Sequence, residues 1–132
     1  MRNNFEEIYK KYISYLNQNV TEIGETLTYW DDPLKSNKTR SIALPLNFST
    51  ENNTLNFTIE LWVFVLDKSP SNITIKQLNI MKQLFSAVYN REAAEEGSIV
   101  DGDSISPTPE MQNIGILRLE IKLTVDYLDD CD

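Results

Sequence analysis

The segment from Leu55 to Leu66, LNFTIELWVFVL, constrains the fold of this chain more than any other. In its first half apolar and polar residues alternate strictly, which is typical of a β-strand with one face in solvent. From Leu61 onward both faces of the strand are apolar. A strand that begins half-exposed and ends covered on both faces belongs in the centre of a sheet, beneath a helix. We therefore expect a sheet built around this segment.

Residues 4–19 have the periodicity of an amphipathic helix. Asn4 is placed to cap its first turn. The helix carries three tyrosines at positions 9, 12 and 15. We interpret them as packed side chains with their hydroxyls in solvent, and a ligand-binding role is the less favoured alternative.

A second helix is predicted to begin at Thr74, which forms a capping box with Gln77 and lies beside a hydrophobic staple between Ile73 and Leu78. This helix is expected to cover one face of the central strand. Its predicted buried stripe consists of Ile75, Leu78, Met81, Leu84 or Phe85, and Val88.

Three further strands are predicted, the first as a short candidate before the turn signal at residues 31–33 and the other two from alternation. They are Thr26 to Trp30, Ile42 to Phe48, and Ile114 to Leu128. Pro45 cannot donate a ladder hydrogen bond, so the second of these strands should lie at an edge or carry a bulge. The polar residues 51–54 predict a hairpin turn into the central strand, which makes the two strands antiparallel neighbours.

Residues 91–112 show little periodicity and predict a long irregular loop, which in a small domain is usually functional or disordered. The chain of 132 residues is expected to form one domain, residues 1–132. The predicted fold class is α+β, with one mixed, mainly antiparallel sheet of about four strands and two helices packed on one face.

Composition favours a non-enzymatic role. The net charge of −8 argues against a nucleic-acid partner, which normally meets a basic face. The chain has no histidine, and its single cysteine, Cys131, lies among acids that raise a thiol pKa. We expect no cofactor. The N-terminus lacks the apolar core of a signal peptide, and no apolar run is long enough to cross a membrane.

The pairs Asp31–Asp32, Asp101–Asp103 and Asp129–Asp130 could in principle bind a metal ion or share acid and base roles. Each lacks the further oxygen ligands of a calcium loop, so we interpret them as solvated loop charge. A small enzyme with a carboxylate site is therefore kept as an alternative hypothesis.

The candidate functional residues therefore belong to an interaction surface. Trp62, Phe64 and Leu66 share one face of the central strand. If the helices cover the opposite face, these three side chains are exposed in the monomer and need a partner. The alternative is that the N-terminal helix or Trp30 covers them.

The layout of nearly the whole chain resembles the tail terminator (minor tail protein) family of long-tailed bacteriophages, the lambda type in particular. The resemblance runs through TLTYWDDP, the strand SIALPLNF, the strand LNFTIELWVFVLD with its Pro-Ser spacer, the helix ITIKQLNIMKQLF and the final strand LRLEIKLTVDY. The strand, spacer and helix from Leu55 to Leu84 are the most similar part.

The resemblance implies a ring, commonly hexameric, which stops polymerisation of the tail tube and offers the head-joining surface. The implied partners are other copies of the chain, the tail-tube protein and a head-completion or connector protein. The implied location is the host cytoplasm during assembly and then the virion tail. The loop Ala93–Met111 would order against the tube or a neighbour, which adds Ile99 and Met111 to the candidate interface of Trp30, Trp62, Phe64 and Leu66.

A rival reading is a small acidic inhibitor that mimics DNA and acts on a DNA-binding host enzyme, because the chain carries a charge of −8. Such a mimic needs acids spaced along one face like phosphates. In this sequence the acids cluster in turns, in the long loop and at the C-terminus.

Overall fold

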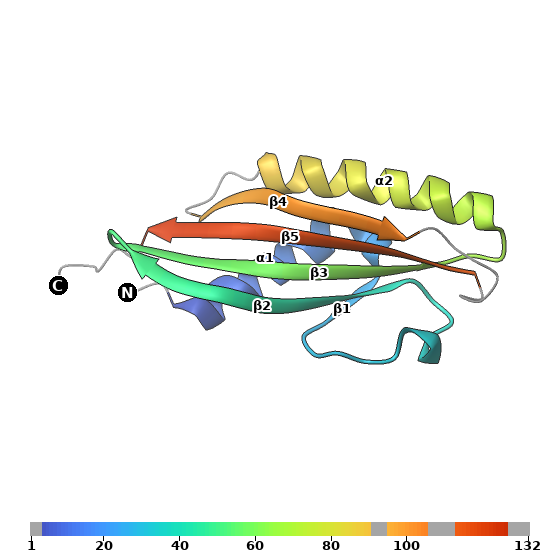
Figure 1. Cartoon of the computed structure of the whole chain (residues 1–132), viewed down its shortest axis with the longest axis horizontal. Helices are drawn as coiled ribbons and strands as arrows, with labels where there is room; N and C mark the ends of the chain where they lie inside the picture. Colours follow the sequence, from blue (N-terminus) through green and yellow to red (C-terminus); the bar gives the residue numbers. More distant parts are fainter. Residues whose placement is uncertain (1–3, 91–94, 106–112, 127–132) are drawn as a thin grey trace.

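Five strands form one mixed sheet in the computed structural model, which describes residues 4–90, 95–105 and 113–126, and two α-helices pack against it (Figure 1). The elements in chain order are α1 (Phe5–Asn19), a 3₁₀ turn (Thr21–Ile23), β1 (Glu25–Leu27), a second 3₁₀ turn (Pro33–Lys35), β2 (Arg40–Glu51), β3 (Thr54–Leu66), α2 (Pro70–Tyr89), β4 (Glu95–Ile105) and β5 (Ile114–Asp126). The strand order is β1-β2-β3-β5-β4, in which only β1 and β2 are parallel. The predicted fold class is confirmed.

The central position of β3 is also confirmed, because β3 pairs along its whole length with β5 and along most of it with β2. The odd-numbered residues of β3 from Leu55 to Val65 face the helices and are buried. The even-numbered residues face the other side of the sheet, which we call the open face. These helix-side residues form part of the main hydrophobic core, and their removal from water stabilises the folded state.

The hairpin between β2 and β3 turns where the sequence predicts. Asn52 and Asn53 have φ of 49° and 62°, a left-handed conformation that asparagine tolerates better than most residues. Pro45 lies beyond the short stretch where β1 pairs with β2, so its missing N–H faces an unpaired edge. A register shift between Leu46 and Ser49 adds the expected bulge.

Helix α1 begins as predicted, with Asn4 accepting a hydrogen bond from the backbone N–H of Glu7 at 2.9 Å. Its three tyrosines pack against the rest of the protein, but their hydroxyls are not all in solvent. Tyr9 donates to the carbonyl of Ala43 at 2.6 Å and Tyr12 is fully buried. Burial raises the pKa of the Tyr9 hydroxyl.

Helix α2 covers the sheet as expected, but its start and its buried face differ from the prediction. It begins at Pro70 rather than Thr74, and the Thr74 hydroxyl donates to the carbonyl of Pro70 instead of capping. The buried residues of α2 are Ile73, Gln77, Ile80, Leu84, Ala87 and Val88. Ile75 and Leu78 are 57% and 67% exposed. Leu84 and Val88 of the predicted stripe are buried, whereas Ile75 and Leu78 are not, because α2 has apolar residues on two faces and only one can meet the sheet.

The largest correction concerns residues 91–112, predicted as an irregular loop. Strand β4 occupies much of this segment and pairs antiparallel with β5. Its helix-side positions include Gly97, Gly102 and Ser104, and a bulge between Ile99 and Asp101 shifts the phase. Small residues and a phase shift together erase the alternation on which strand prediction depends.

At the start of the chain, β1 ends at Leu27, earlier than the predicted Trp30. Gly24 precedes it with φ of +67°. The predicted final strand is confirmed as far as Asp126, and residues 127–128 of that prediction lie outside the described part of the chain.

Both α-helices lie on one face of the sheet, with α2 along the β4 side of the molecule, away from β1 (Figure 1). A smaller apolar cluster lies on the open face, where Ile42, Phe64 and Ile114 are buried. Within the described residues no helix is both long and apolar enough to span a bilayer.

Candidate protein-interaction surfaces

Three aromatic rings meet on the open face of the sheet. The Trp30 ring lies edge-on to Trp62 with 5.4 Å between ring centroids, and edge-on to Phe64 with 5.9 Å. Edge-to-face packing brings the positive edge of one ring against the negative face of another, which stabilises the cluster beyond its buried area. Of the two predicted arrangements, an exposed face or a face covered by Trp30, the monomer therefore has the second.

Coverage by Trp30 is incomplete. Phe64 is only 1% exposed, whereas Trp30 itself is 54% exposed. Trp62 and Leu66 are half-buried. We call Trp30, Trp62 and Leu66 the aromatic surface, because these three of the predicted interface residues keep area that a partner could cover.

Several bonds anchor the loop that carries Trp30 on its C-terminal side. The Asp31 carboxylate pairs with the Arg40 guanidinium at 3.3 Å, and Arg40 also donates to the carbonyl of Asp32. The Thr39 hydroxyl accepts a hydrogen bond from the backbone N–H of Leu66 at 3.1 Å. The backbone N–H of Asp32, which donates to the Asp31 carboxylate, is the main cause that lowers the pKa of Asp31. These bonds hold Trp30 over the sheet.

Beside the aromatic surface, Arg118 gathers four carboxylates on the open face. Its guanidinium lies 3.0 Å from Glu60, 3.2 Å from Glu120, 3.4 Å from Asp103 and 3.6 Å from Asp101. The pKa of Asp101 is lowered, mainly because the backbone N–H of Gly102 donates to its carboxylate. One guanidinium cannot balance four carboxylates, so this area is negatively charged.

Arg118 also joins this acidic cluster to the aromatic surface. Its guanidinium lies 5.9 Å from the centre of the Trp62 ring, and the Trp62 indole N–H donates to the Glu60 carboxylate at 2.9 Å. A cation over an aromatic face gains electrostatic energy from the ring quadrupole. The orientation of Trp62 is therefore set from both sides.

A second apolar surface lies on the solvent-exposed side of α2. Ile75, Leu78, Phe85 and Tyr89 are each at least 43% exposed there. We call these four residues the outer face of α2. Exposed apolar residues at helical spacing on one face are uncommon in isolated soluble domains and typically mark an interface. The sequence contained this signal, but we assigned the pattern to the buried side of the helix.

Between α2 and β4 lies a groove of about 400 Å³. Its apolar side is formed by Met81 and Phe85 of α2 with Leu117 and Leu119 beneath them, and its other wall is β4 from Ile99 to Ser104. Val100, at the bulge, is 56% exposed at its margin.

Tyr89 connects α2 to the backbone of β4. Its hydroxyl accepts a hydrogen bond from the N–H of Ile99 at 2.9 Å and donates to the carbonyl of the same residue at 3.4 Å. Ile99, a predicted interface residue, is half-buried and packs against the main core. Met111, the last predicted interface residue, lies outside the described residues.

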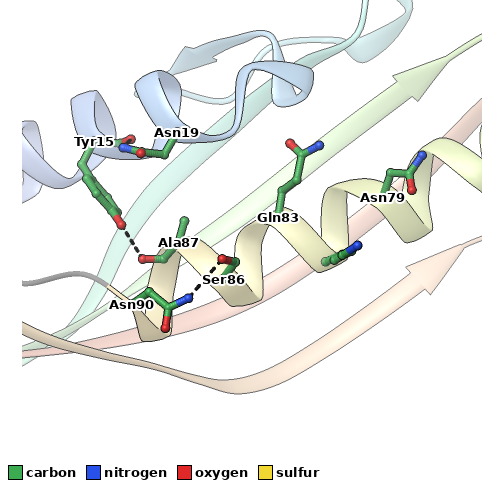
Figure 2. A pocket seen from close by; sticks show the side chains of 8 residues that line it. Tyr15, Asn19, Asn79, Gln83, Ser86, Ala87 and Asn90 are labelled. Atoms are coloured by element: carbon green, nitrogen blue, oxygen red, sulfur yellow. Dashed lines mark hydrogen bonds between the residues drawn. The ribbon is translucent and has the colours of Figure 1, made fainter.

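A polar pocket of about 490 Å³ separates the C-terminal parts of α1 and α2 (Figure 2). Asn79, Gln83 and Asn90 line it from α2, and the Tyr15 hydroxyl reaches across from α1 to donate to the carbonyl of Ala87 at 2.6 Å. Amide side chains make up half of its lining, which also includes Lys82 and Ser86.

The acidic pairs carry ion pairs rather than a shared ligand site. Asp31 pairs with Arg40 and Lys35, while Asp101 and Asp103 share Arg118. Among residues 4–90, 95–105 and 113–126, no group of three or more acidic, cysteine or histidine side chains is arranged to hold a metal ion. The pair at 129–130 lies outside those ranges.

The chain was also compared with known proteins. No protein-family model matches it, and no curated protein has a significantly similar sequence.

Proposed function

We propose that this chain is a ring-forming structural subunit of a long phage or prophage tail, which ends polymerisation of the tail tube and provides the surface for head joining. One observation carries the proposal: the molecule exposes two different apolar surfaces on two sides. The aromatic surface lies on the open face of the sheet, and the outer face of α2 lies along the β4 side.

Two different surfaces on one protomer suit a head-to-tail interface. Suppose that the aromatic surface of one protomer covers the outer face of α2 on the next. The resulting pair then has a free outer face of α2 at one end and a free aromatic surface at the other. Repetition with a closing rotation then produces a ring, such as the hexamer implied by the family resemblance. A two-fold dimer would instead bury the same surface on both partners.

The remaining partners follow from the same proposal. The tail-tube protein and a head-completion or connector protein would meet the two rims of the ring. Assembly takes place in the host cytoplasm, and the ring then stays in the virion tail. The acidic cluster around Arg118 supports this role over a DNA mimic, because its carboxylates converge on one guanidinium instead of following a line.

The first experiment measures the mass of the purified chain by size-exclusion chromatography with light scattering over a range of concentrations. We expect a ring for the unmodified chain. Trp30→Ser removes the aromatic surface, and Leu78→Ser removes the centre of the outer face of α2, so each variant should be monomeric.

Mixing the two variants tests the head-to-tail geometry directly. Each variant keeps one intact surface, so the mixture should form a dimer through the single intact pair and go no further. Val100→Ser, which truncates an exposed apolar residue outside both surfaces, is the matched control and should still form rings. A chain that stays monomeric at high concentration, or a mixture that fails to dimerise, overturns the proposed interface.

The second experiment adds the ring to growing tail tubes made from a purified phage tail-tube protein. The ring should cap the tubes and fix their length, as seen by electron microscopy. Rings that leave tube growth unchanged would refute the tail role while leaving self-assembly in place.

A further inference from the structure

We propose that the outer edge of β4 binds an extended peptide segment of another protein, in which apolar residues alternate with lysine or arginine. The bound segment would add a strand to the sheet beneath the overhanging side of α2. This inference does not depend on ring formation.

The edge is open to a further strand. In the described part of the chain, β4 pairs only with β5, so its outer side has no strand beside it. Edge strands are commonly protected by proline, by charged residues or by a bulge. Strand β4 has no proline, its bulge lies before Asp101, and its carboxylates at Asp101 and Asp103 would repel an acidic segment but attract a basic one. An unpaired edge of this kind is the site at which peptides add by main-chain hydrogen bonding.

Tyr89 shows how α2 reaches past this edge. Its hydroxyl bonds to both the N–H and the carbonyl of Ile99, the two groups that a neighbouring strand would use. The bulge at Val100 then separates this position from the stretch Asp101–Ser104. In that stretch the N–H of Gly102 donates to the Asp101 carboxylate at 2.9 Å, and it would exchange this bond for one to the peptide backbone. The proposed peptide pairs with that second stretch.

The helix side of the edge is apolar. The groove of about 400 Å³ places Met81 and Phe85 above the Asp101–Ser104 stretch, with Leu117 and Leu119 beneath. Side chains of an added strand that point to the helix side would enter this groove. Apolar residues are favoured there, because they remove Phe85, now 43% exposed, from water.

The open-face side of the same edge is acidic. Asp101 lies opposite Glu120 and Asp103 opposite Arg118 in the β4–β5 register. The side chains of Asp101 and Asp103 are 58% and 69% exposed, and both share Arg118 with Glu60 and Glu120. Charge complementarity therefore selects a basic occupant on this side.

The apolar helix side and the acidic open-face side of the β4 edge together define the sequence of the bound segment. Side chains alternate between the two faces of a strand, so a segment under α2 and beside the carboxylates must alternate apolar and basic residues. A purely apolar segment would leave the excess negative charge uncompensated, and a purely basic one would leave the groove empty.

The test uses a capped, fluorescein-labelled heptapeptide in which leucine alternates with lysine, titrated with the full chain and followed by fluorescence anisotropy. The peptide should bind, and hydrogen exchange should slow at the backbone amides of residues 101–104. Replacing lysine with glutamate in the peptide, or collecting its leucines and lysines into two blocks, should abolish binding.

Variants of the chain assign the contacts. Phe85→Ser should weaken binding by about tenfold, as expected when an aromatic interface residue is truncated. The double variant Asp101→Asn, Asp103→Asn should weaken binding by about fivefold at low salt and reduce its salt dependence. Ile75→Ser, on the same helix but outside the groove, and Trp30→Ser should bind the peptide normally.

Three outcomes overturn the proposal. The first is equal binding of the glutamate peptide, and the second is slowed exchange at β1 or β2 in place of β4. The third is a Phe85→Ser variant that binds the peptide as tightly as the unmodified chain. Because Trp30→Ser blocks ring assembly and spares the peptide site, a failure here is distinguishable from a failure of the ring.

Discussion

Gly24 holds a backbone conformation that no other residue type could adopt without cost. Its φ is +67°, and a Cβ placed on it would lie 2.1 Å from the carbonyl oxygen of Thr39. Two separate penalties therefore act at this position: the left-handed conformation and a collision with backbone that cannot rotate away. The chain needs this glycine to bring β1 alongside β2.

Gly24→Ala should lower the free energy of unfolding by about 2 kcal/mol or more, because strain in a left-handed backbone adds to the steric collision. Urea denaturation followed by circular dichroism measures the change. Asn53→Ala is the control, because Asn53 also has positive φ but lies in an exposed hairpin turn. A cost at Gly24 no larger than that at Asn53 would show that the contact with Thr39 relaxes.

Asp67 links the end of β3 to α2 through its carboxylate, which pairs with the Lys76 ammonium at 2.7 Å and accepts from the N–H of Ser69 at 3.0 Å. The bond to Lys76 is the largest cause that lowers the pKa of Asp67 from 3.8 to about 2. A lowered folded-state pKa contributes stability above the unfolded pKa and loses it as the pH falls through the folded value.

Asp67→Asn should therefore destabilise the fold at neutral pH, and the difference from the unmodified chain should shrink as the pH falls from 3.8 to about 2. Urea midpoints measured across this pH range give the difference directly. Glu51→Gln, in the exposed hairpin between β2 and β3, serves as a charge-matched control. A difference that stays constant down to the lowest pH would mean that the Asp67 carboxylate is not held by Lys76.

At the scale of the element, α2 shows why the existence of a helix is easier to predict than its orientation. Its sequence has apolar residues both at the buried face with Ile80 and Leu84 and at the outer face with Leu78 and Phe85. Periodicity identifies either stripe equally well. The stripe that packs against the sheet includes Gln77, whose amide donates to the carbonyl of Ile116 at 3.4 Å.

The two faces of α2 should respond differently to truncation. Ile80→Ala should cost about 2–4 kcal/mol of unfolding free energy, because it leaves a cavity in the core. Leu78→Ser should cost no more than about 1 kcal/mol, which is the loss of helix propensity at an exposed site. Denaturation under conditions where both variants are monomeric compares them, and the reverse order of costs would contradict the orientation of α2.

Strand β4, unlike α2, could not be predicted as an element from its local sequence pattern. Three of its helix-side positions carry glycine or serine, and the bulge at Val100 breaks the period of two. The strand forms because β5 offers a complete edge on which its backbone can pair. Ile99 was predicted as an interface residue in a loop, but it packs against the main core from a strand.

At the scale of the whole molecule, both helices cover one face of the sheet, and the loop with Trp30 covers only part of the other. The strands in the middle are therefore protected on more sides than those at the edges. Protection against local opening follows burial and hydrogen bonding.

Hydrogen exchange should separate the strands into two classes. The amides of β3 and of the β5 residues paired with it should exchange slowest, through global unfolding, and those of β1 and the outer side of β4 should exchange through local opening. Exchange measured by NMR at the monomer concentration tests this order. Equal rates in β3 and β4 would show that the β4 edge is covered in solution.

Local patterns along the chain were enough to predict the α+β class, the central position of β3, the hairpin turn at residues 51–54 and the cap at Asn4. Each of these depends on local periodicity or on the conformational preference of one or two residues, and both are properties of a short segment. Three features emerge only when the elements pack together: the buried side of α2, the formation of β4 as a strand, and the position of Trp30 over Trp62 and Phe64. These features depend on what lies opposite each surface, which alternation along a chain does not encode.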